Sequence, residues 1–233
     1  MAAQTRVKPT TKPTTEQKNI QANKTFFGRW SKTYDSLGIR FWMRRFQIPA
    51  LREIKFQPGI KILDLSCGTG ELLQDLYRRG KGKIKLFGLD ISEEMLEMAR
   101  KKLPLEVTLV RGDVHRLPFD SGEFDYVLCT EAFHHYHSQY QAVTEMKRVL
   151  KNDGKIIIVD INFFLPSIHW LFQKLEPGCV KINNQGEMGL LFKKNGLKIA
   201  RQQRNFLFAI MTIGQKEERG KKDKNMEKEE IRK

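Results

Sequence analysis

Two carboxylates and a glycine-rich turn carry the clearest chemical signal in this sequence. Asp64 lies in a short apolar run, residues 62–65, and Gly68 and Gly70 follow where a helix is predicted to begin. Glycines in such a turn let the backbone approach a ligand, and the first N–H groups of a helix have no partners within it. Asp90 ends the next apolar run, about 20 residues past the turn, where a ribose-binding carboxylate belongs. We therefore predict a nucleotide-type pocket at the carboxyl edge of a parallel sheet.

The turn does not fit two common nucleotide sites. A dinucleotide fingerprint requires a small residue three positions after its second glycine, and Leu73 stands there. A Walker-type loop requires Gly-Lys followed by Ser or Thr, which is missing from this stretch. An acid at position 64 suits a ligand that carries an ammonium group, and it would repel a pyrophosphate.

Five ordered motifs resemble those of the class I S-adenosylmethionine (SAM)-dependent methyltransferases. They are Asp64-Leu-Ser-Cys-Gly-Thr-Gly70, Gly-Leu-Asp90-Ile-Ser, Gly-Asp113-Val, Phe124-Asp-Tyr-Val-Leu-Cys and Arg148-Val-Leu-Lys-x-x-Gly154. The first resembles Asp-x-Gly-x-Gly-x-Gly, with Ser66 in place of the first glycine. The resemblance covers about residues 26–216, is of the methyltransferase type 11 kind, and extends distantly to the ubiquinone and menaquinone methyltransferases.

This resemblance implies SAM as the cofactor and assigns a role to each motif. Asp64 and the loop that contains Ser66, Cys67, Gly68 and Gly70 would hold the methionine moiety. Asp90 would accept both ribose hydroxyls, and Ile91 would lie against the adenine. Asp113 would accept a hydrogen bond from the adenine amino group, and Val114 would supply a backbone N–H.

Fewer residues indicate how the methyl acceptor would be bound or activated. His134 and His135 follow the predicted fourth strand, and a histidine there could deprotonate a hydroxyl near neutral pH. His135 better matches the histidine of the resembled family, and the alternative is that these side chains only form hydrogen bonds within the pocket. Tyr34 matches a Tyr-Asp pair in the quinone methyltransferases and is predicted to lie over the site. The sequence has no paired metal-ligand spacing, so no metal is expected.

Alternating apolar strands and amphipathic helices predict the fold. We expect strands at 61–65, 83–89, 107–110, 124–129 and 155–161, helices at 71–79, 93–103, about 138–151 and 187–194, and a C-terminal strand pair at 197–201 and 206–213. The predicted class is therefore α/β: a Rossmann-like, doubly wound, seven-stranded sheet, mostly parallel with an antiparallel C-terminal pair. Pro49 is expected to divide the preceding segment into two helices, and Asn152-Asp153-Gly154 is expected to close the helix before the fifth strand.

The domain prediction is one methyltransferase domain at 26–215 with a helical cap at 26–56, between a disordered basic tail at 1–25 and a disordered charged tail at 216–233. The formal net charge is +15. That charge fits a polyanionic partner or peripheral contact with an anionic membrane, but a solvated lysine-rich surface explains it as well. The three cysteines indicate no disulfide framework, and without an apolar leader or a membrane-spanning stretch a cytoplasmic location is expected.

The predicted function is transfer of the SAM methyl group to an oxygen or carbon atom of a small, apolar or aromatic acceptor, quinol-like acceptors included. The aromatic segments before and after the core favour such an acceptor. The residues Thr130-Glu131-Ala132-Phe133 depart from the Asn/Asp-Pro-Pro-aromatic motif of exocyclic-amine nucleic-acid methyltransferases. Two alternatives stay open: an RNA-directed methyltransferase, and a catalytically silent SAM-binding scaffold. The oligomeric state is not predicted.

Overall fold

A seven-stranded sheet forms the centre of the molecule in the computed structural model, which describes residues 37–163, 165–205 and 208–216. The strand order is β3-β2-β1-β4-β5-β7-β6; β7 is antiparallel to both of its neighbours, β5 and β6, and the other pairs are parallel. The strands are β1 (Lys61–Leu65), β2 (Lys85–Asp90), β3 (Thr108–Arg111), β4 (Phe124–Thr130), β5 (Leu150–Ile161), β6 (Leu197–Asn205) and β7 (Ala209–Lys216). The predicted fold class is confirmed.

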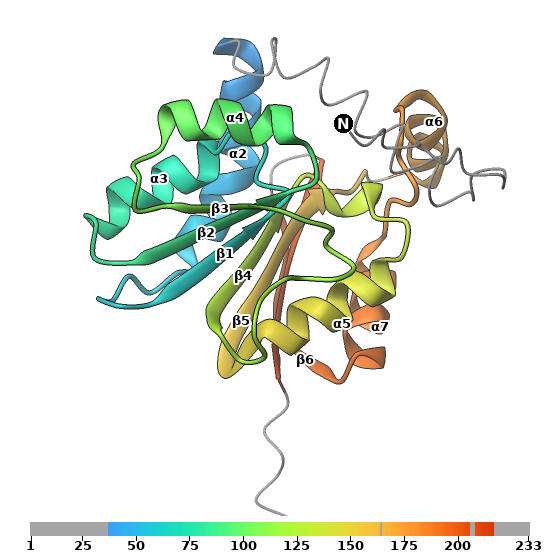
Figure 1. Cartoon of the computed structure of the whole chain (residues 1–233). Coiled ribbons are helices and arrows are strands. Elements are labelled where there is room, and N and C mark those ends of the chain that lie inside the picture. The colour runs from blue at the N-terminus through green and yellow to red at the C-terminus, as the bar shows by residue number, and fades with distance from the viewer. Residues whose placement is uncertain (1–36, 164, 206–207, 217–233) are drawn as a thin grey trace, which may run out of the picture.

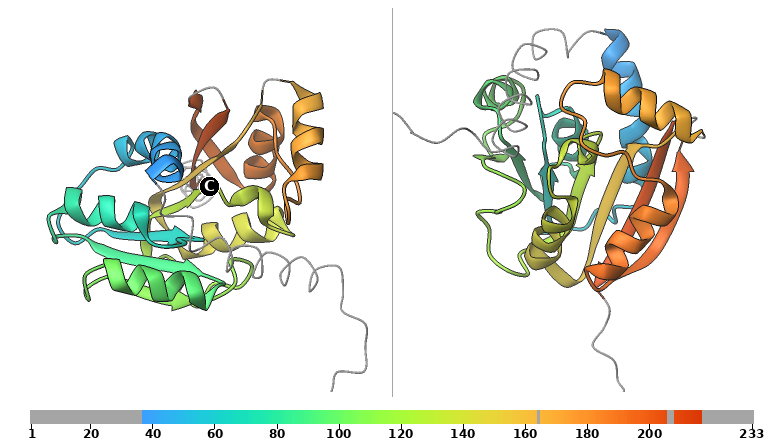
Figure 2. Two further views of the ribbon diagram at one scale, coloured as in Figure 1. Left: turned by 90° about the horizontal axis from the view of Figure 1, so that it is seen from above. Right: turned by 90° about the vertical axis from the view of Figure 1, so that its right-hand side faces the viewer.

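Helices cover both faces of this sheet (Figures 1 and 2). On one face, α2 (Leu37–Arg52), α3 (Glu71–Gly80) and α4 (Glu93–Lys102) bury apolar side chains against the strands. On the other face, α5 (Gln139–Val149) and α7 (Gln185–Lys194) do the same. The strands separate these two cores because successive side chains point to opposite faces: Ile157 belongs to the first core and Ile158 to the second.

Local sequence signals fix several helix ends. Ser92 caps α4 by accepting a hydrogen bond from the backbone N–H of Met95, and Ser138 caps α5 in the same way. Asn184 and Glu187 form a reciprocal capping box at the start of α7. The predicted helices at 93–103, 138–151 and 187–194 are confirmed to within a few residues.

Two local predictions were wrong. Pro49 lies inside α2, which continues to Arg52, so it does not divide two helices. The segment Asn152-Asp153-Gly154 is part of β5 and forms an irregularity in it, because Phe124 pairs with Leu150 while Tyr126 pairs with Lys155. Strand β5 therefore begins to pair with β4 before residues 152–154. These residues form a bulge, and the pairing continues after them.

The segment after β5 forms a helix that the sequence analysis did not assign. This helix, α6 (Pro166–Leu175), lies beyond the carboxyl edge of the sheet, on the side of α5 and α7 (Figure 1). The predicted tails at 1–25 and 216–233 and the first part of the predicted cap lie outside the described residues, except for Lys216. No helix in the described ranges is long and apolar enough to cross a membrane.

Candidate functional site

The loop between β1 and α3 turns through three left-handed residues. Ser66, Gly68 and Gly70 have φ angles of 57°, 52° and 82°. Glycine adopts this conformation without strain, whereas the Cβ of a larger residue is crowded by the backbone. At Gly70 a side chain would also meet Leu103, because an added Cβ would lie 2.7 Å from its Cδ1. Both glycines of the motif are thus required by the path of the chain.

Ser66 stands at the one position where the motif departs from glycine, and its side chain is held in place. Its Oγ lies 2.9 Å from the hydroxyl of Tyr136, which in turn lies 3.2 Å from Sγ of Cys129. Tyr136 is buried beneath the loop. This hydrogen bond offsets the cost of a left-handed serine, so the substitution is compatible with the tight turn.

Asp90 joins the end of β2 to this loop. Its Oδ2 accepts a hydrogen bond from the backbone N–H of Gly68 at 2.8 Å, and its Oδ1 accepts one from Ser92 at 2.9 Å. Burial raises the pKa of Asp90, and hydrogen bonds from the backbone of Ser92, Gly68 and Ile91 oppose that shift. A carboxylate has about four lone-pair positions, so these donors do not exhaust its capacity to accept from a ligand.

A small pocket opens beside the loop, at the carboxyl ends of β1 and β4. Its lining consists of Gln47, Asp64, Ser66, Cys67, Gly68, Thr69, Glu71, Leu72 and Thr130. Asp64 is 2% exposed, and burial together with the nearby charge of Asp90 raises its pKa well above the ordinary value. The structure therefore brings the predicted residues 64, 66, 67 and 68 to one pocket.

Gln47 is a pocket residue that sequence reasoning missed. It comes from α2, and its Oε1 is buried without a hydrogen-bond partner among the described residues. An unsatisfied buried amide oxygen is costly unless a ligand or water donates to it. Its position beside the carboxylate of Asp64 makes this end of the pocket rich in acceptors, which fits an ammonium group. No motif marks Gln47, and only the docking of α2 brings it there.

Asp113 and Val114 follow β3, outside the lining of that pocket. Oδ1 of Asp113 accepts hydrogen bonds from the backbone N–H of His115 at 2.9 Å and from its Nδ1 at 2.6 Å, and these bonds lower the pKa of Asp113. Val114 is buried in the second core, and Ile91 is half-buried after β2. Gly112 donates to the carbonyl of Asp90, so the ends of β2 and β3 lie side by side.

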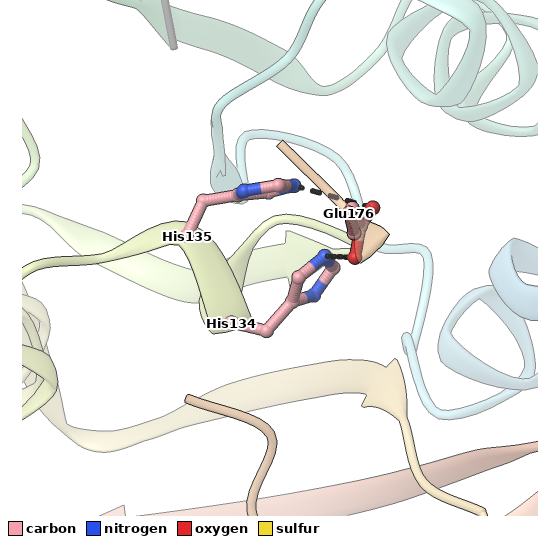
Figure 3. A group of neighbouring side chains, drawn as sticks. All are labelled: His134, His135 and Glu176. Carbon is pink, nitrogen blue, oxygen red and sulfur yellow. Dashed lines mark ion pairs between the residues drawn. The ribbon is translucent and has the colours of Figure 1, made fainter. Parts of the chain in front are cut away.

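The two candidate histidines lie in η1 (Phe133–His135), a short 3-10 helix just after β4, and both are buried. His134 Nδ1 donates to Oδ1 of Asp160 at 2.6 Å, and its Nε2 lies 3.3 Å from Oε2 of Glu176. His135 Nε2 lies 3.7 Å from Oε1 of the same Glu176 (Figure 3). Tyr34 lies outside the described residues.

The electrostatic surroundings separate the two histidines. Burial would lower the pKa of His134, but the carboxylates of Asp160 and Glu176 outweigh it and raise that pKa to about 10. Burial and the neighbouring His134 lower the pKa of His135 to about 4. The two carboxylates thus favour positive charge at His134, whereas burial favours the neutral form of His135.

Glu131, close to the two histidines, is another residue that the sequence analysis did not identify as part of a site. It is the non-glycine residue at φ 55° directly after β4, and burial followed by the charge of Asp160 raises its pKa to about 8. Its Oε1 is buried without a hydrogen-bond partner in the described part of the chain. Unusual backbone angles and buried acids gather at functional sites.

Arg148, from the last of the five motifs, stabilises the segment between β3 and β4 and lies outside the pocket lining. Its guanidinium donates to the carbonyl oxygens of Leu117 and Phe119 at 2.8 Å each and pairs with Glu145. Glu145 in turn accepts from the backbone N–H of Leu117. This pair anchors the connection between β3 and β4, which carries Asp113 and His115.

The comparisons with known proteins agree with this geometry. Residues 63–158 match the family model described as a methyltransferase domain. The ubiquinone/menaquinone biosynthesis C-methyltransferase UbiE of Citrifermentans bemidjiense is 29% identical over 170 residues, which cover 66% of this chain and 71% of that protein. Together these matches support a class I SAM-dependent methyltransferase.

Other proteins resemble this chain in sequence or in fold. The demethylmenaquinone methyltransferase of Staphylococcus epidermidis is 35% identical over 141 residues, 58% of each chain. A SAM-dependent methyltransferase from Aquifex aeolicus has the same fold, with a TM-score of 0.66 at 20% identity, covering 80% of this chain and 97% of that one. A methyltransferase structure from Haloferax volcanii, solved in complex with the Trm112 activator, has a TM-score of 0.71 at 22% identity and covers 82% and 98%.

Proposed function

We propose that this methyltransferase acts on an oxygen or carbon atom of a small aromatic or apolar acceptor, with a quinol-like ring as the best-supported class. The observation that carries the proposal is the convergence of Asp64, Gln47 and Thr130 on one pocket at the carboxyl ends of β1 and β4. Thr130 of this pocket is followed directly by Glu131, and His134 and His135 come four and five residues after Thr130. Donor and acceptor sites would therefore be neighbours, as direct transfer requires.

On the cofactor side, the residues of the pocket match the groups of SAM in turn. Asp64 and Gln47 would accept hydrogen bonds from the ammonium group, and the carboxylate of Asp90 would accept from the ribose hydroxyls. Ser66, Cys67, Gly68 and Gly70 would shape the loop around the methionine moiety. Ile91, Asp113 and Val114 would bind the adenine, although Oδ1 of Asp113 already binds His115.

When bound, SAM supplies an electrophilic methyl group on a sulfonium. The chain itself then has to hold the acceptor atom about 3–3.5 Å away and in line, which can remove several kcal/mol of the barrier. Water must also be excluded from this space. Thr130, at the end of β4, lies between the pocket and the residues of the acceptor side and would border both.

On the acceptor side, His135 and His134 remain the proposed residues, with Tyr34 a further candidate. An aromatic cluster supports an aromatic or apolar acceptor: the ring of Phe163 packs against those of Phe172 and Phe208 at centroid distances of 5.1 and 5.7 Å. Phe163 follows β5 closely after Asp160, the hydrogen-bond partner of His134. The names of the relatives point to quinone precursors as acceptors of those proteins.

Transfer of label from tritiated-methyl SAM tests this function. The protein is incubated with a fractionated cell extract and separately with a naphthoquinol, and lipid, small-molecule, RNA and protein fractions are counted. We expect label in the lipid or small-molecule fraction and in the quinol. The Glu97→Ala variant, which changes an exposed acid of α4, is the control and should transfer label as the unaltered chain does.

Three outcomes would contradict the proposal in different ways. Label in RNA alone would overturn the acceptor class and favour an RNA-directed enzyme. Binding of S-adenosylhomocysteine without transfer to any fraction would indicate a catalytically silent scaffold. Failure to bind S-adenosylhomocysteine at all would overturn the assignment of the cofactor pocket.

A further inference from the structure

His134, His135 and Glu176 present three ligand atoms to one point at the acceptor side of the sheet. One nitrogen from each histidine and one oxygen from Glu176 all lie within 4.8 Å of one another. Figure 3 shows the imidazole rings of two consecutive residues of η1 directed toward the Glu176 carboxylate. The sequence analysis found no metal-ligand spacing because Glu176 lies far along the chain, at the end of α6.

The distance between His134 and Glu176 fits a shared ion better than a charge-assisted hydrogen bond. The 3.3 Å from His134 Nε2 to Glu176 Oε2 is longer than a charge-assisted hydrogen bond of about 2.7–2.9 Å. Neither of these two atoms has a hydrogen-bond partner in the described ranges, although both are buried. Zinc bonds of about 2.0–2.1 Å in a tetrahedron place neighbouring ligand atoms roughly 3.3 Å apart. The separation between His134 and Glu176 matches that value.

His134 is also oriented as a metal-binding histidine is. His134 donates through Nδ1 to Asp160 at 2.6 Å, which directs its Nε2 toward Glu176. A carboxylate behind a histidine in this way fixes the tautomer and strengthens the ligand. The chain after Glu176 is held to η1, because the N–H groups of Val180 and Lys181 both donate to the carbonyl of His134.

Negative charge accumulates around these histidines. Asp160 and Glu176 contact His134 directly, and their negative charges also act on the buried Glu131, the first residue after β4. The Glu176 side chain is 22% exposed, so an ion could enter from solvent. Burying several carboxylates together is costly unless a cation compensates them.

We propose that His134, His135 and Glu176 bind one divalent transition-metal ion, with zinc as the best match. Two imidazoles and one carboxylate form a three-ligand set of the catalytic zinc type, which leaves a fourth position open. Resting on the proposed function, we further infer that this open position receives an oxygen atom of the acceptor. The ion would hold that oxygen beside the pocket bordered by Thr130 and lower the pKa of its hydroxyl.

Metal titration tests the site without relying on activity. The full chain is freed of metal with a chelator and titrated with Zn²⁺ by calorimetry and with Co²⁺ by visible absorption. We expect one equivalent to bind and Co²⁺ to show a tetrahedral spectrum. Glu176→Gln and His135→Ala should each weaken binding by at least about tenfold, and Asp160→Asn by about 10–100-fold through the ligand that it orients.

His137→Ala is the matched control, because this neighbouring histidine stacks on His115 and lies outside the cluster. It should bind the metal like the unaltered chain. Binding of S-adenosylhomocysteine, measured in parallel, verifies that each variant is folded and that the cofactor pocket is intact. An unaltered chain that binds S-adenosylhomocysteine but neither Zn²⁺ nor Co²⁺ would overturn the metal site and leave the proposed function standing.

Measurements of activity test the inferred role of the ion in binding the acceptor. With a naphthoquinol as acceptor, chelation should abolish methyl transfer and Zn²⁺ should restore it. Equal transfer with and without the ion would overturn its role in acceptor binding. Zn²⁺ binding that is unchanged in Glu176→Gln would overturn the assignment of the ligands.

Discussion

The carboxylate of Asp90 accepts a hydrogen bond from the backbone N–H of Gly68 at 2.8 Å, so the end of β2 holds the loop that follows β1. One side chain thereby connects two motifs that are separate in the sequence. The same carboxylate is the proposed ribose acceptor. Asp90 therefore shapes the loop and is also proposed to bind the ligand, and both roles enter the predictions for its variants.

Asp90→Ala should lower the affinity for S-adenosylhomocysteine by at least about tenfold. The substitution removes charge-assisted acceptors, each worth roughly 1.5–3 kcal/mol, from the ribose site. It also leaves the N–H groups of Gly68 and Ser92 without their acceptor, so the melting temperature should fall. Calorimetry measures the affinity and circular dichroism the stability. Unchanged affinity in a folded Asp90→Ala variant would remove this residue from the site.

Gln47→Ala should weaken the binding of S-adenosylhomocysteine but not that of methylthioadenosine, which lacks the amino-acid moiety. The proposed contact of Gln47 is with the ammonium group, whereas Asp90 contacts the ribose that both ligands share. Asp64→Asn should behave like Gln47→Ala, and Asp90→Ala should weaken both ligands. Calorimetric titrations with the two ligands measure this contrast. An equal loss for both ligands in Gln47→Ala would contradict the assignment of the ammonium end.

Tyr136→Phe should destabilise the protein by about 1–3 kcal/mol, because Ser66 Oγ loses its partner in a largely buried place. Adding Ser66→Gly removes that hydroxyl and suits the left-handed backbone at this position. The double variant should therefore be more stable than Tyr136→Phe alone. Chemical denaturation of the four proteins in this cycle measures the coupling. Strictly additive effects would show that the two side chains act independently.

Glu145→Gln should destabilise the fold by on the order of 1 kcal/mol at neutral pH, because it weakens the pair with Arg148. Hydrogen bonding to Arg148 lowers the pKa of Glu145. A lowered pKa gives stability that is fully present above the ordinary value of 4.5 and is lost as the pH falls toward the pKa of the folded protein.

The difference in stability between the unaltered chain and Glu145→Gln should therefore shrink below about pH 4.5. Thermal unfolding across this pH range measures it, with Glu97→Gln as the exposed control. A difference that stays constant from neutral to acidic pH would show that the charge of Glu145 does not carry the effect.

The sequence by itself determined the sheet, most helix ends and the cofactor loop, because these depend on signals within a few residues of one another. Apolar runs define strands 61–65 and 124–129, Ser92 marks a helix start, and glycine spacing marks the turn at 68–70. What the sequence could not reveal depends on packing between distant segments. Pro49 stays within α2, where Phe46 and Ala50 pack against the sheet in the first core.

The candidate site divides in the same way. Asp64 and Asp90 were identified because each ends a strand at the edge where ligands bind in α/β folds. Gln47, Glu131 and Glu176 were not, since no local pattern marks them and each gains its neighbours only when α2, β4 or α6 docks. Tertiary structure decided that Glu176 faces the two histidines and that Asp160 orients one of them. These contacts join residues of η1, β5 and the end of α6, which only the folded chain brings within reach of one another.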